Sequence, residues 1–320
     1  MLNFNSILDA RERIEKYLYK TPLEKSIHLS DDNTSIYFKL ENQQKTRSYK
    51  IRGVLSKITS LNQEEKEKGI VAISSGNHGA AVSYASSLLG IENAAVYVPT
   101  STPKTKVEKI KYYGANVEQV GINYDETYKL GMERVKRSGA TFIDSSSDEM
   151  VICGQGTIGL EILEENPHID TILVPIGGGG IITGISIAAK AINPNIKIIG
   201  LQTAACPAMV ESLKDNKFYE SFPSEKSICD ALVGGVGYIP FKMAKECIDD
   251  IIVVEEEDIK KAISHLLLKE KLMVEPAGAI GVGAVLANYH MFQGKNVAIV
   301  LTGGNIDEDL IISSILNKNN

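Results

Sequence analysis

Short apolar runs alternate with helical patterns along most of this chain. A first series of apolar runs lies at 70–73, 94–98, 116–120 and 141–143, with helical patterns between them at 79–89, 104–112 and 125–138. A second series lies at 171–176, 197–201, 251–254 and 296–301, with a last helical pattern near 308–316. This alternation predicts βαβ units with buried parallel strands. We therefore expect an α/β fold of two lobes, each a mostly parallel sheet flanked by helices.

The composition excludes several classes of protein. A formal net charge of −6 over 320 residues gives no basic face for nucleic acid or for an anionic membrane surface. No stretch approaches the roughly 18 apolar residues of a membrane span, and the N-terminus lacks a basic segment followed by an apolar run. The four cysteines lie far apart in the sequence, which disfavours a zinc site and a disulfide scaffold. We expect a cytoplasmic protein with free thiols.

Lys50 lies where a strand pattern at 36–40 gives way to a helical pattern. Apolar residues recur after it at helical spacing, at Ile51, Val54, Leu55, Ile58 and Leu61. An amine near the positive end of a helix and close to Arg52 should lose its proton more easily than a solvated lysine, as a Schiff-base nucleophile must. The alternative is an ordinary solvated surface lysine.

Four consecutive glycines, Gly177 to Gly180, separate a buried strand pattern from a helical pattern. Backbone without side chains at a helix start offers several N–H donors to a phosphate. The Walker spacing fails because Ile185 stands in place of its lysine, and the dinucleotide fingerprint lacks its third glycine. The segment therefore predicts a site for a single phosphate monoester, with a flexible turn as the alternative.

The segment 74–78 also leads from a strand pattern into a helical pattern. Serine and asparagine at a helix start are ordinary N-caps, and the same backbone geometry suits a substrate carboxylate. Ser75 could in addition donate or accept a proton if a neighbouring group activated it. His78 is better explained as a packed histidine than as a catalyst.

Two loops near the C-terminus complete the set of candidates. Thr302 precedes two glycines and could offer its hydroxyl to a heterocycle nitrogen, or the segment could be a bare turn. Glu275 stands just before Pro276, which suits the first turn of a helix. Its carboxylate could complement the helix dipole and have no other role, or it could belong to a site.

Several segments together resemble the fold-type II (tryptophan synthase β-like) pyridoxal-phosphate enzymes, and most closely the serine/threonine dehydratases, also called threonine ammonia-lyases, and the serine racemases. The segments are 48–53, 75–79, 154–159, 177–180 and 302–305, and the resemblance extends over 21–307. It implies that the cofactor lies in a cleft between two domains. These would be a large, discontinuous cofactor-binding domain at 1–68 and 147–320 and a small substrate-loop domain at 69–146.

The resemblance also implies roles for individual residues. Lys50 would form the internal aldimine with pyridoxal 5'-phosphate, Asn77 would bond the ring hydroxyl, and Thr302 would face the pyridine nitrogen. A hydroxyl opposite that nitrogen does not keep it protonated, so the cofactor would be a weaker electron sink and would favour loss of a β-substituent. The remaining cofactor contacts would be Tyr49, Gly177, Gly178, Gly179, Gly180 and Ile181. The substrate carboxylate would be held by Ser74, Ser75, Gly76, Asn77 and His78.

The reaction implied by this resemblance is β-elimination. A hydroxy-amino acid such as L-threonine or L-serine would lose its hydroxyl and amine to give a 2-oxo acid and ammonia, with Lys50 as anchor and base. The family also suggests a homodimer. One alternative is racemase activity, alone or beside elimination, because serine racemases use a serine at the place of Ser75 to deliver a proton to the opposite face. Another is a noncatalytic ligand-binding α/β protein.

Several positions depart from the family pattern. Arg47 and Ala231 stand where the dehydratases commonly have glycine, Tyr49 replaces phenylalanine, and Thr302 replaces serine. These changes bear on the pocket walls, and so on substrate choice, more than on the cofactor. Racemase-like members hold a divalent cation with a carboxylate that Gln202 replaces here, so we expect no metal at that place. Because the chain ends soon after 307, we expect no added regulatory domain.

Overall fold

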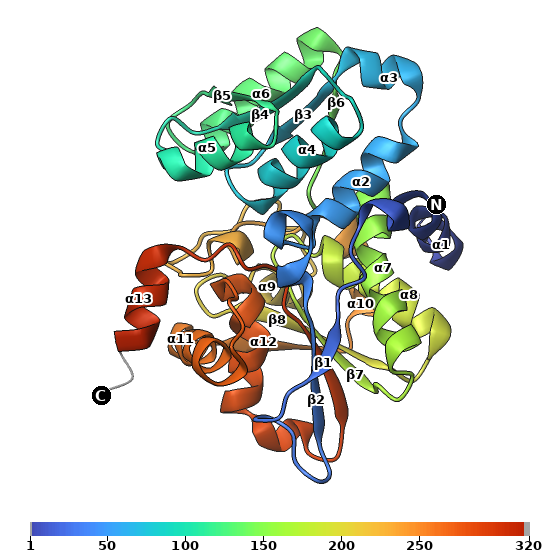
Figure 1. The fold of residues 1–320 in the computed structure, drawn as a ribbon, viewed down its shortest axis with the longest axis vertical. Helices are drawn as coiled ribbons and strands as arrows, with labels where there is room; N and C mark the ends of the chain where they lie inside the picture. Colours follow the sequence, from blue (N-terminus) through green and yellow to red (C-terminus); the bar gives the residue numbers. More distant parts are fainter. Residues whose placement is uncertain (1, 317–320) are drawn as a thin grey trace.

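The computed structural model describes residues 2–316 and contains two β-sheets (Figure 1). The larger sheet has the order β1-β2-β10-β7-β8-β9, and the smaller has the order β5-β4-β3-β6. All neighbouring strands are parallel except β1 with β2. The larger sheet consists of β1 (Leu23–Lys25), β2 (Ser35–Lys39), β7 (Thr171–Pro175), β8 (Lys197–Thr203), β9 (Asp250–Val254) and β10 (Asn296–Val300). The smaller consists of β3 (Ile70–Ile73), β4 (Ala94–Val98), β5 (Asn116–Gln119) and β6 (Thr141–Phe142).

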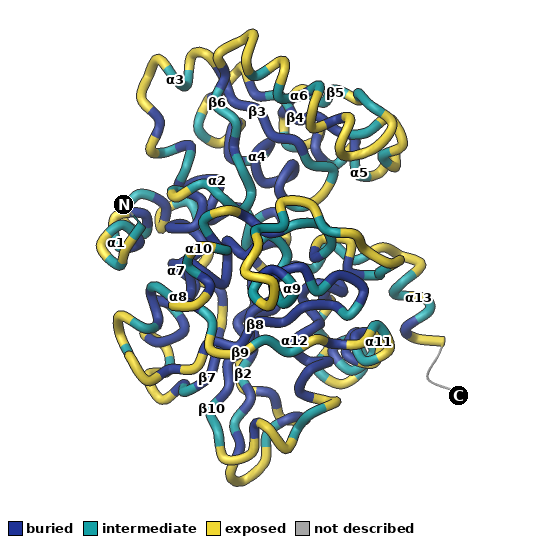
Figure 2. The backbone as a smooth tube through the Cα atoms, turned by 180° about the vertical axis from the view of Figure 1, so that it is seen from behind, coloured by how far each residue is buried: buried dark blue, intermediate teal, exposed yellow. Residues whose placement is uncertain are grey.

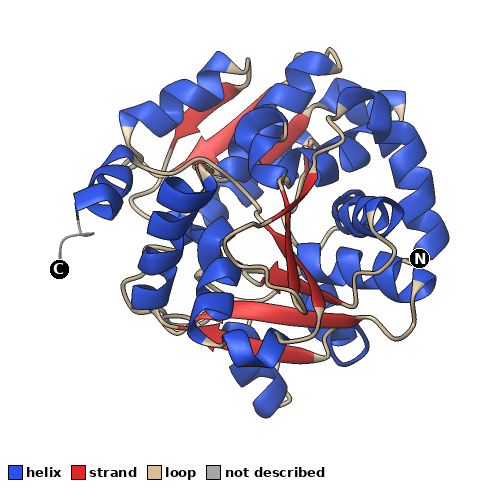
Figure 3. Cartoon of the chain, turned by 60° about the horizontal axis from the view of Figure 1, so that its bottom comes forward, coloured by secondary structure: helices blue, strands red, loops and turns tan. Residues whose placement is uncertain are grey.

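Helices flank both sheets (Figure 3). Those beside the smaller sheet are α4 (Asn77–Leu88), α5 (Lys104–Tyr112) and α6 (Tyr124–Ser138). Those packed on or around the larger sheet include α7 (Glu149–Glu165), α8 (Gly180–Ile192), α10 (Tyr238–Cys247), α11 (Glu256–His265) and α12 (Pro276–Ala287). The others are α1 (Phe4–Ile14), α2 (Lys50–Ser60), α3 (Gln63–Lys68), α9 (Ala208–Lys214) and α13 (Glu308–Leu316). The predicted α/β fold with mostly parallel, helix-flanked sheets is confirmed.

The central strands of the larger sheet, β7, β8 and β10, are buried along nearly their whole length, whereas the edge strands β1 and β9 are partly exposed (Figure 2). Along β7, Leu173 packs into a core cluster with residues of α12, whereas its neighbours Ile172 and Val174 pack into a second cluster with residues of α8. Side chains that alternate along a strand point to opposite faces of the sheet. Both faces are apolar here, which explains why these strands appear in the sequence as continuous apolar runs.

The first helix begins with a capping box. Asn3 is the N-cap of α1 and accepts a hydrogen bond from the backbone N–H of Ser6, whose hydroxyl accepts one from the backbone N–H of Asn3 in return. Helix α1 ends at Ile14, where a short 3₁₀ turn, Glu15–Tyr17, follows it. Strand β1 was not predicted from the sequence, because a strand of three residues is too short to show a period.

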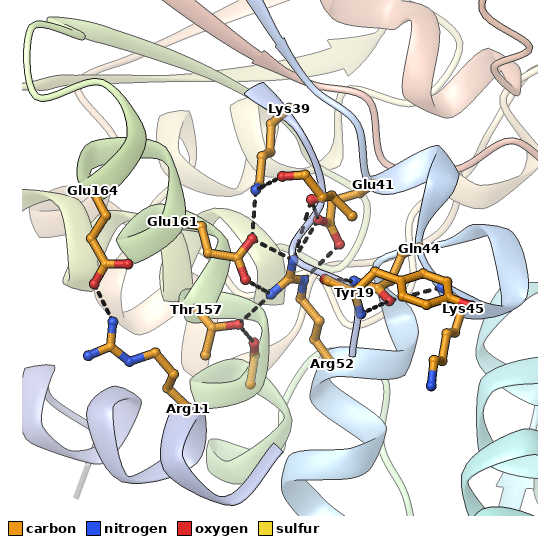
Figure 4. A network of polar contacts seen from close by, with 12 residues as sticks. Arg11, Tyr19, Lys39, Glu41, Gln44, Lys45, Arg52, Thr157, Glu161 and Glu164 are labelled. Atoms are coloured by element: carbon orange, nitrogen blue, oxygen red, sulfur yellow. Dashed lines mark hydrogen bonds and ion pairs between the residues drawn. The ribbon is translucent and has the colours of Figure 1, made fainter. Parts of the chain in front are cut away.

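A buried network of charged side chains lies beneath the start of α2 (Figure 4). The guanidinium of Arg52 donates to Glu41 through Nε at 2.8 Å and to Glu161 through Nη1 at 2.6 Å. Lys39 also donates to Glu161, through Nζ at 2.6 Å. The charges of two cations and two carboxylates balance, so each buried charge has a partner that offsets its loss of water. The network joins β2, the turn after it, α2 and α7.

Replacing Arg52 with methionine removes the partner of a carboxylate, Glu41, whose side chain is fully buried. We expect the free energy of unfolding to fall by about 3–5 kcal/mol, because the uncompensated charge remains in the interior. Urea-induced unfolding measures the loss. The matched control is Arg11→Met, which removes the exposed pair with Glu164 and should cost less than about 1 kcal/mol. Equal losses in the two variants would contradict the argument.

Candidate active site

Lys50 is the first residue of α2 and stands among the loops singled out in the sequence. Its Nζ lies 3.5 Å from the carbonyl oxygen of Ser145 and 5.2 Å from the centre of the Tyr49 ring. The backbone before α2 runs beside the loop after β10, where the N–H of Tyr49 donates to the carbonyl of Thr302 at 3.1 Å. The structure thus places Lys50 next to Thr302, although the sequence separates them widely.

The guanidinium of Arg52 is bonded to carboxylates of the buried network. These carboxylates belong to Glu41 and Glu161, and they balance its charge. These contacts tie the first turn of α2 to Glu41 and to α7. The position of Lys50 at the helix N-terminus agrees with the sequence-based prediction.

The glycine segment 177–180 forms a cradle at the N-terminus of α8. Gly179 has a left-handed backbone with φ of +90°, and Gly180 begins the helix. A Cβ on Gly178 would lie 2.6 Å from the Cβ of Ser146, and one on Gly180 would lie 2.9 Å from Oε1 of Gln155. Only glycine fits there, and the first backbone N–H groups of a helix have no partner within it. The cradle can therefore donate to an anion.

Two residues that border this cradle, Ser146 and Gln155, were not predicted from the sequence as site residues. Ser146 belongs to the polar segment between β6 and α7, and Gln155 lies on α7 within the segment 154–159 that resembles the family. Oε1 of Gln155 is buried and has no hydrogen-bond partner in the described chain. This oxygen is a buried polar group beside the cradle that a ligand or water can satisfy.

Asn77 begins α4 and connects the two sheets. Its Nδ2 donates to Oε1 of Glu275 at 2.8 Å, and its Oδ1 accepts from Nδ2 of Asn305 at 2.6 Å. Glu275 precedes α12, and Asn305 lies in the loop after β10. Burial raises the pKa of Glu275 to about 7. A polar cluster thus surrounds the amide to which the resemblance assigns the cofactor ring hydroxyl.

The segment 74–78 leads from β3 into α4, whose N-cap is Gly76. Ser74 and Ser75 are partly exposed, so this helix N-terminus is open to a carboxylate. The ring of His78 is buried, with Nε2 2.8 Å from the carbonyl oxygen of Ile143. Burial lowers its pKa to about 4, so the ring is neutral near pH 7. The side chain of His78 is a packing group, as the sequence suggested, and only its backbone N–H faces the open end of the helix.

Gln202, the second-last residue of β8, accepts hydrogen bonds from backbone N–H groups. Its Oε1 accepts from the N–H groups of Met209 and Val210, both at 3.0 Å. Among residues 2–316, no group of three or more histidine, cysteine or acidic side chains is placed to hold a metal ion.

In the same residues, no helix combines the length and the apolar character needed to cross a bilayer.

Comparisons with known proteins agree with this geometry. Residues 14–303 match the family model described as pyridoxal-phosphate dependent enzyme. An L-threonine ammonia-lyase of Thermotoga maritima is 40% identical over 320 residues, which cover 99% of this chain and 79% of that protein. The structure of maize serine racemase has a TM-score of 0.91 at 34% identity, covering 99% of this chain and 97% of that one. Processed threonine deaminase isoform 2 of Solanum lycopersicum has a TM-score of 0.93 at 28% identity, covering 100% and 97%.

The family model covers nearly the whole chain, from α1 to the loop after β10. It includes the lysine at the start of α2, the glycine cradle and the open N-terminus of α4. The glycine cradle, with free N–H donors at the start of α8, also fits a phosphate monoester. The chain therefore belongs to the family of pyridoxal-phosphate-dependent enzymes.

Proposed function

We propose that this protein is an ammonia-lyase that converts L-threonine or L-serine to a 2-oxo acid and ammonia by β-elimination. The position of Lys50 carries the proposal. Its amine lies 3.5 Å from the carbonyl oxygen of Ser145, next to the Ser146 that borders the glycine cradle, and it is close enough to His78 at the start of α4 to contribute to lowering the pKa of that ring. The two anionic groups of a cofactor–amino acid pair would thus be held on either side of the base. Similarity to an L-threonine ammonia-lyase supports the same reaction.

The residues present fit pyridoxal 5'-phosphate. Lys50 would hold it covalently, the segment 177–181 would hold its phosphate, and Asn77 and Thr302 would contact its ring. Tyr49, whose ring is packed beside the Lys50 amine, would line the same place. Once bound, the cofactor supplies an electron sink for the α-carbon of an amino acid.

The protein's own groups would bind the substrate and move its proton. Backbone N–H groups at the start of α4, from the segment 74–78, would receive the α-carboxylate. That contact would orient the α-hydrogen toward the Lys50 amine, which acts as the base. The carbonyl of Ser145 accepts from this amine and would hold it in place between turnovers. His78 would take no proton near pH 7, because its ring is buried and neutral.

Racemase activity is the second candidate, and the position of Ser75 favours it. Ser75 lies partly exposed in the same loop that would bind the carboxylate, so its hydroxyl could serve a proton transfer on a different face from Lys50. The similarity to maize serine racemase supports this candidate. Elimination and racemisation share the abstraction of the α-proton. They differ in the next step, which is loss of the β-hydroxyl in one and return of a proton in the other.

We also propose a domain division and an assembly. Residues 69–146 would form the small substrate-loop domain, and residues 1–68 with 147–320 the large one. All four strands of the smaller sheet fall inside the first range, which supports this division. We propose a cytoplasmic location, supported by four buried cysteines that are free thiols. A homodimer rests on the family resemblance and is tested by analytical ultracentrifugation.

Lys50→Ala tests the proposed function directly. We expect loss of 2-oxo acid formation from L-threonine and L-serine, and loss of cofactor trapped by borohydride, because the only proposed anchor and base is removed. Oxo-acid assay and mass spectrometry of the reduced protein measure the two effects. Lys25→Ala, at an exposed lysine of β1, should change neither. Full retention of trapping and turnover without Lys50 would end the proposal.

Gly178→Ala tests the phosphate cradle. The added Cβ would meet Ser146 at 2.6 Å, so we expect the dissociation constant of the cofactor to rise about tenfold or more while the protein still folds. A fluorescence titration with pyridoxal 5'-phosphate measures it. Gly90→Ala is the control: its φ of +70° makes the added Cβ costly for folding stability, but no atom lies within 4 Å of that Cβ and the position is outside the cradle, so cofactor affinity should not change. An unchanged affinity in Gly178→Ala would place the phosphate elsewhere.

Ser75→Ala separates the two reactions. We expect elimination from L-serine to fall less than tenfold, because Lys50 remains, and any formation of D-serine to disappear. Chiral chromatography beside an oxo-acid assay measures both products. If D-serine formation persists in the variant, Ser75 is not the second proton carrier.

A further inference from the structure

Glu275 does not behave as an ordinary residue of a helix N-terminus. It is the N-cap of α12, yet its side chain makes no capping hydrogen bond. Instead Oε1 accepts from Nδ2 of Asn77, and Oε2 accepts from the backbone N–H of Asn305 at 3.2 Å. The carboxylate is almost fully buried, so forming these contacts requires it to give up water. An interaction of the Glu275 carboxylate with the dipole of α12 does not by itself explain its burial or these two hydrogen bonds.

These hydrogen bonds fix the orientation of the Asn77 amide. A carboxylate only accepts hydrogen bonds, so Nδ2 of Asn77 must face Glu275. Oδ1 of Asn77 then faces Nδ2 of Asn305, which also donates to the carbonyl of Thr46 at 3.0 Å. Both contacts require the same orientation of the amide. Glu275 uses one N–H of Asn77, and within residues 2–316 the second N–H is left for a ligand.

We infer that Glu275 is a positioning residue that orients Asn77 so that its second N–H donates to the ring hydroxyl of the cofactor. The inference rests on the proposed role of Asn77. Glu275 and Asn305 belong to the part of the chain built on the larger sheet, whereas Asn77 begins a helix beside the smaller one. The orientation of Asn77 is therefore set from across the cleft. Lys109 of α5 donates to Oδ1 of Asn305 and holds the third member of the cluster.

The charge of Glu275 should control this orientation. Two charged groups face the Glu275 carboxylate: Lys109 from α5, and Asp230 from the 3₁₀ turn Asp230–Leu232. Lys106 and Asp307 line a cavity of about 240 Å³ together with Glu275. Arg47 faces Lys109 from the segment before α2. Burial first, and then the charge of Asp230, raise the pKa of Glu275 to about 7. Protonation would turn one acceptor oxygen into a donor that faces an N–H of Asn77 or Asn305.

The direction in which cofactor affinity changes with pH follows from the loss of one acceptor oxygen when Glu275 is protonated. Above about pH 7 the carboxylate accepts from both donors and Asn77 is held; below it, one contact is lost and cofactor affinity should fall. Glutamine has the shape and neutrality of the protonated carboxyl, with one donor and one acceptor group. Glu275→Gln should therefore behave at every pH like wild type at low pH.

The test is a titration of the full-length protein with pyridoxal 5'-phosphate, without amino acid, at pH 6 and pH 8. We expect the dissociation constant of Glu275→Gln to be about tenfold above wild type at pH 8 and within about twofold of it at pH 6. Protonation of the free cofactor is the same for both proteins and cancels in this ratio. The visible band of the bound cofactor should shift with pH near 7 in wild type and not in the variant. The inference would be overturned if the ratio of the two dissociation constants, Glu275→Gln to wild type, were the same at pH 6 and pH 8, or were one at pH 8.

Two further variants separate positioning from a general structural effect. Glu255→Gln changes the exposed glutamate at the N-cap of α11 and should leave the dissociation constant unchanged. In an Asn77→Ala background, Glu275→Gln should change it less than twofold, because the group through which it acts is gone. A full tenfold effect in that background would refute positioning. The titration contains no amino acid, so its outcome does not depend on catalysis. If the protein binds the cofactor but does not eliminate from threonine, the proposed lyase activity is refuted, and the titration still decides whether Glu275 positions Asn77.

Discussion

The buried pairing of Arg52 with Glu41 and Glu161 supports the rest of the structure. Arg52 lies two residues after Lys50, so the network that holds its guanidinium also fixes the first turn of α2. The partners come from the turn after β2 and from α7, so the larger sheet and its neighbouring helix jointly set the position of the lysine. Such a network contributes little net stability compared with an apolar core, but it permits one arrangement of its members.

The site itself arises from the direction of the strands. Four loops that contribute to it come after the carboxyl ends of parallel strands: 74–78 after β3, 144–147 after β6, 177–180 after β7 and 302–305 after β10. In two of these loops the chain passes directly into a long helix, which offers unpaired N–H groups to anions. In the proposed function, one N-terminus would hold a phosphate and the other a carboxylate, and Lys50 has neighbours beside both of them in Ser145 and His78.

The cluster of Glu275, Asn77 and Asn305 crosses from one sheet to the other. Side chains of α4 and α5 meet the loop after β10 and the start of α12 there, so the relative position of the two sheets and the orientation of one amide depend on the same hydrogen bonds. A buried carboxylate at such a crossing is costly unless both of its oxygens accept hydrogen bonds. If Asn77 has its proposed role, this coupling would make its contact with the cofactor depend on the charge of Glu275, which does not touch the cofactor itself.

The sequence alone determined the strand and helix series, the position of Lys50 at a helix start, the glycine segment and the family resemblance, because period, helix-start chemistry and glycine runs are local signals. It did not reveal Ser146 or Gln155, whose contacts with the cradle depend on chain segments brought together by folding. It also left two interpretations of Glu275 open and did not reveal the carboxylate partners of Arg52. Only the tertiary structure decided these points, since burial and hydrogen-bond partners are fixed by residues far apart in the chain: 198 positions separate Asn77 from Glu275.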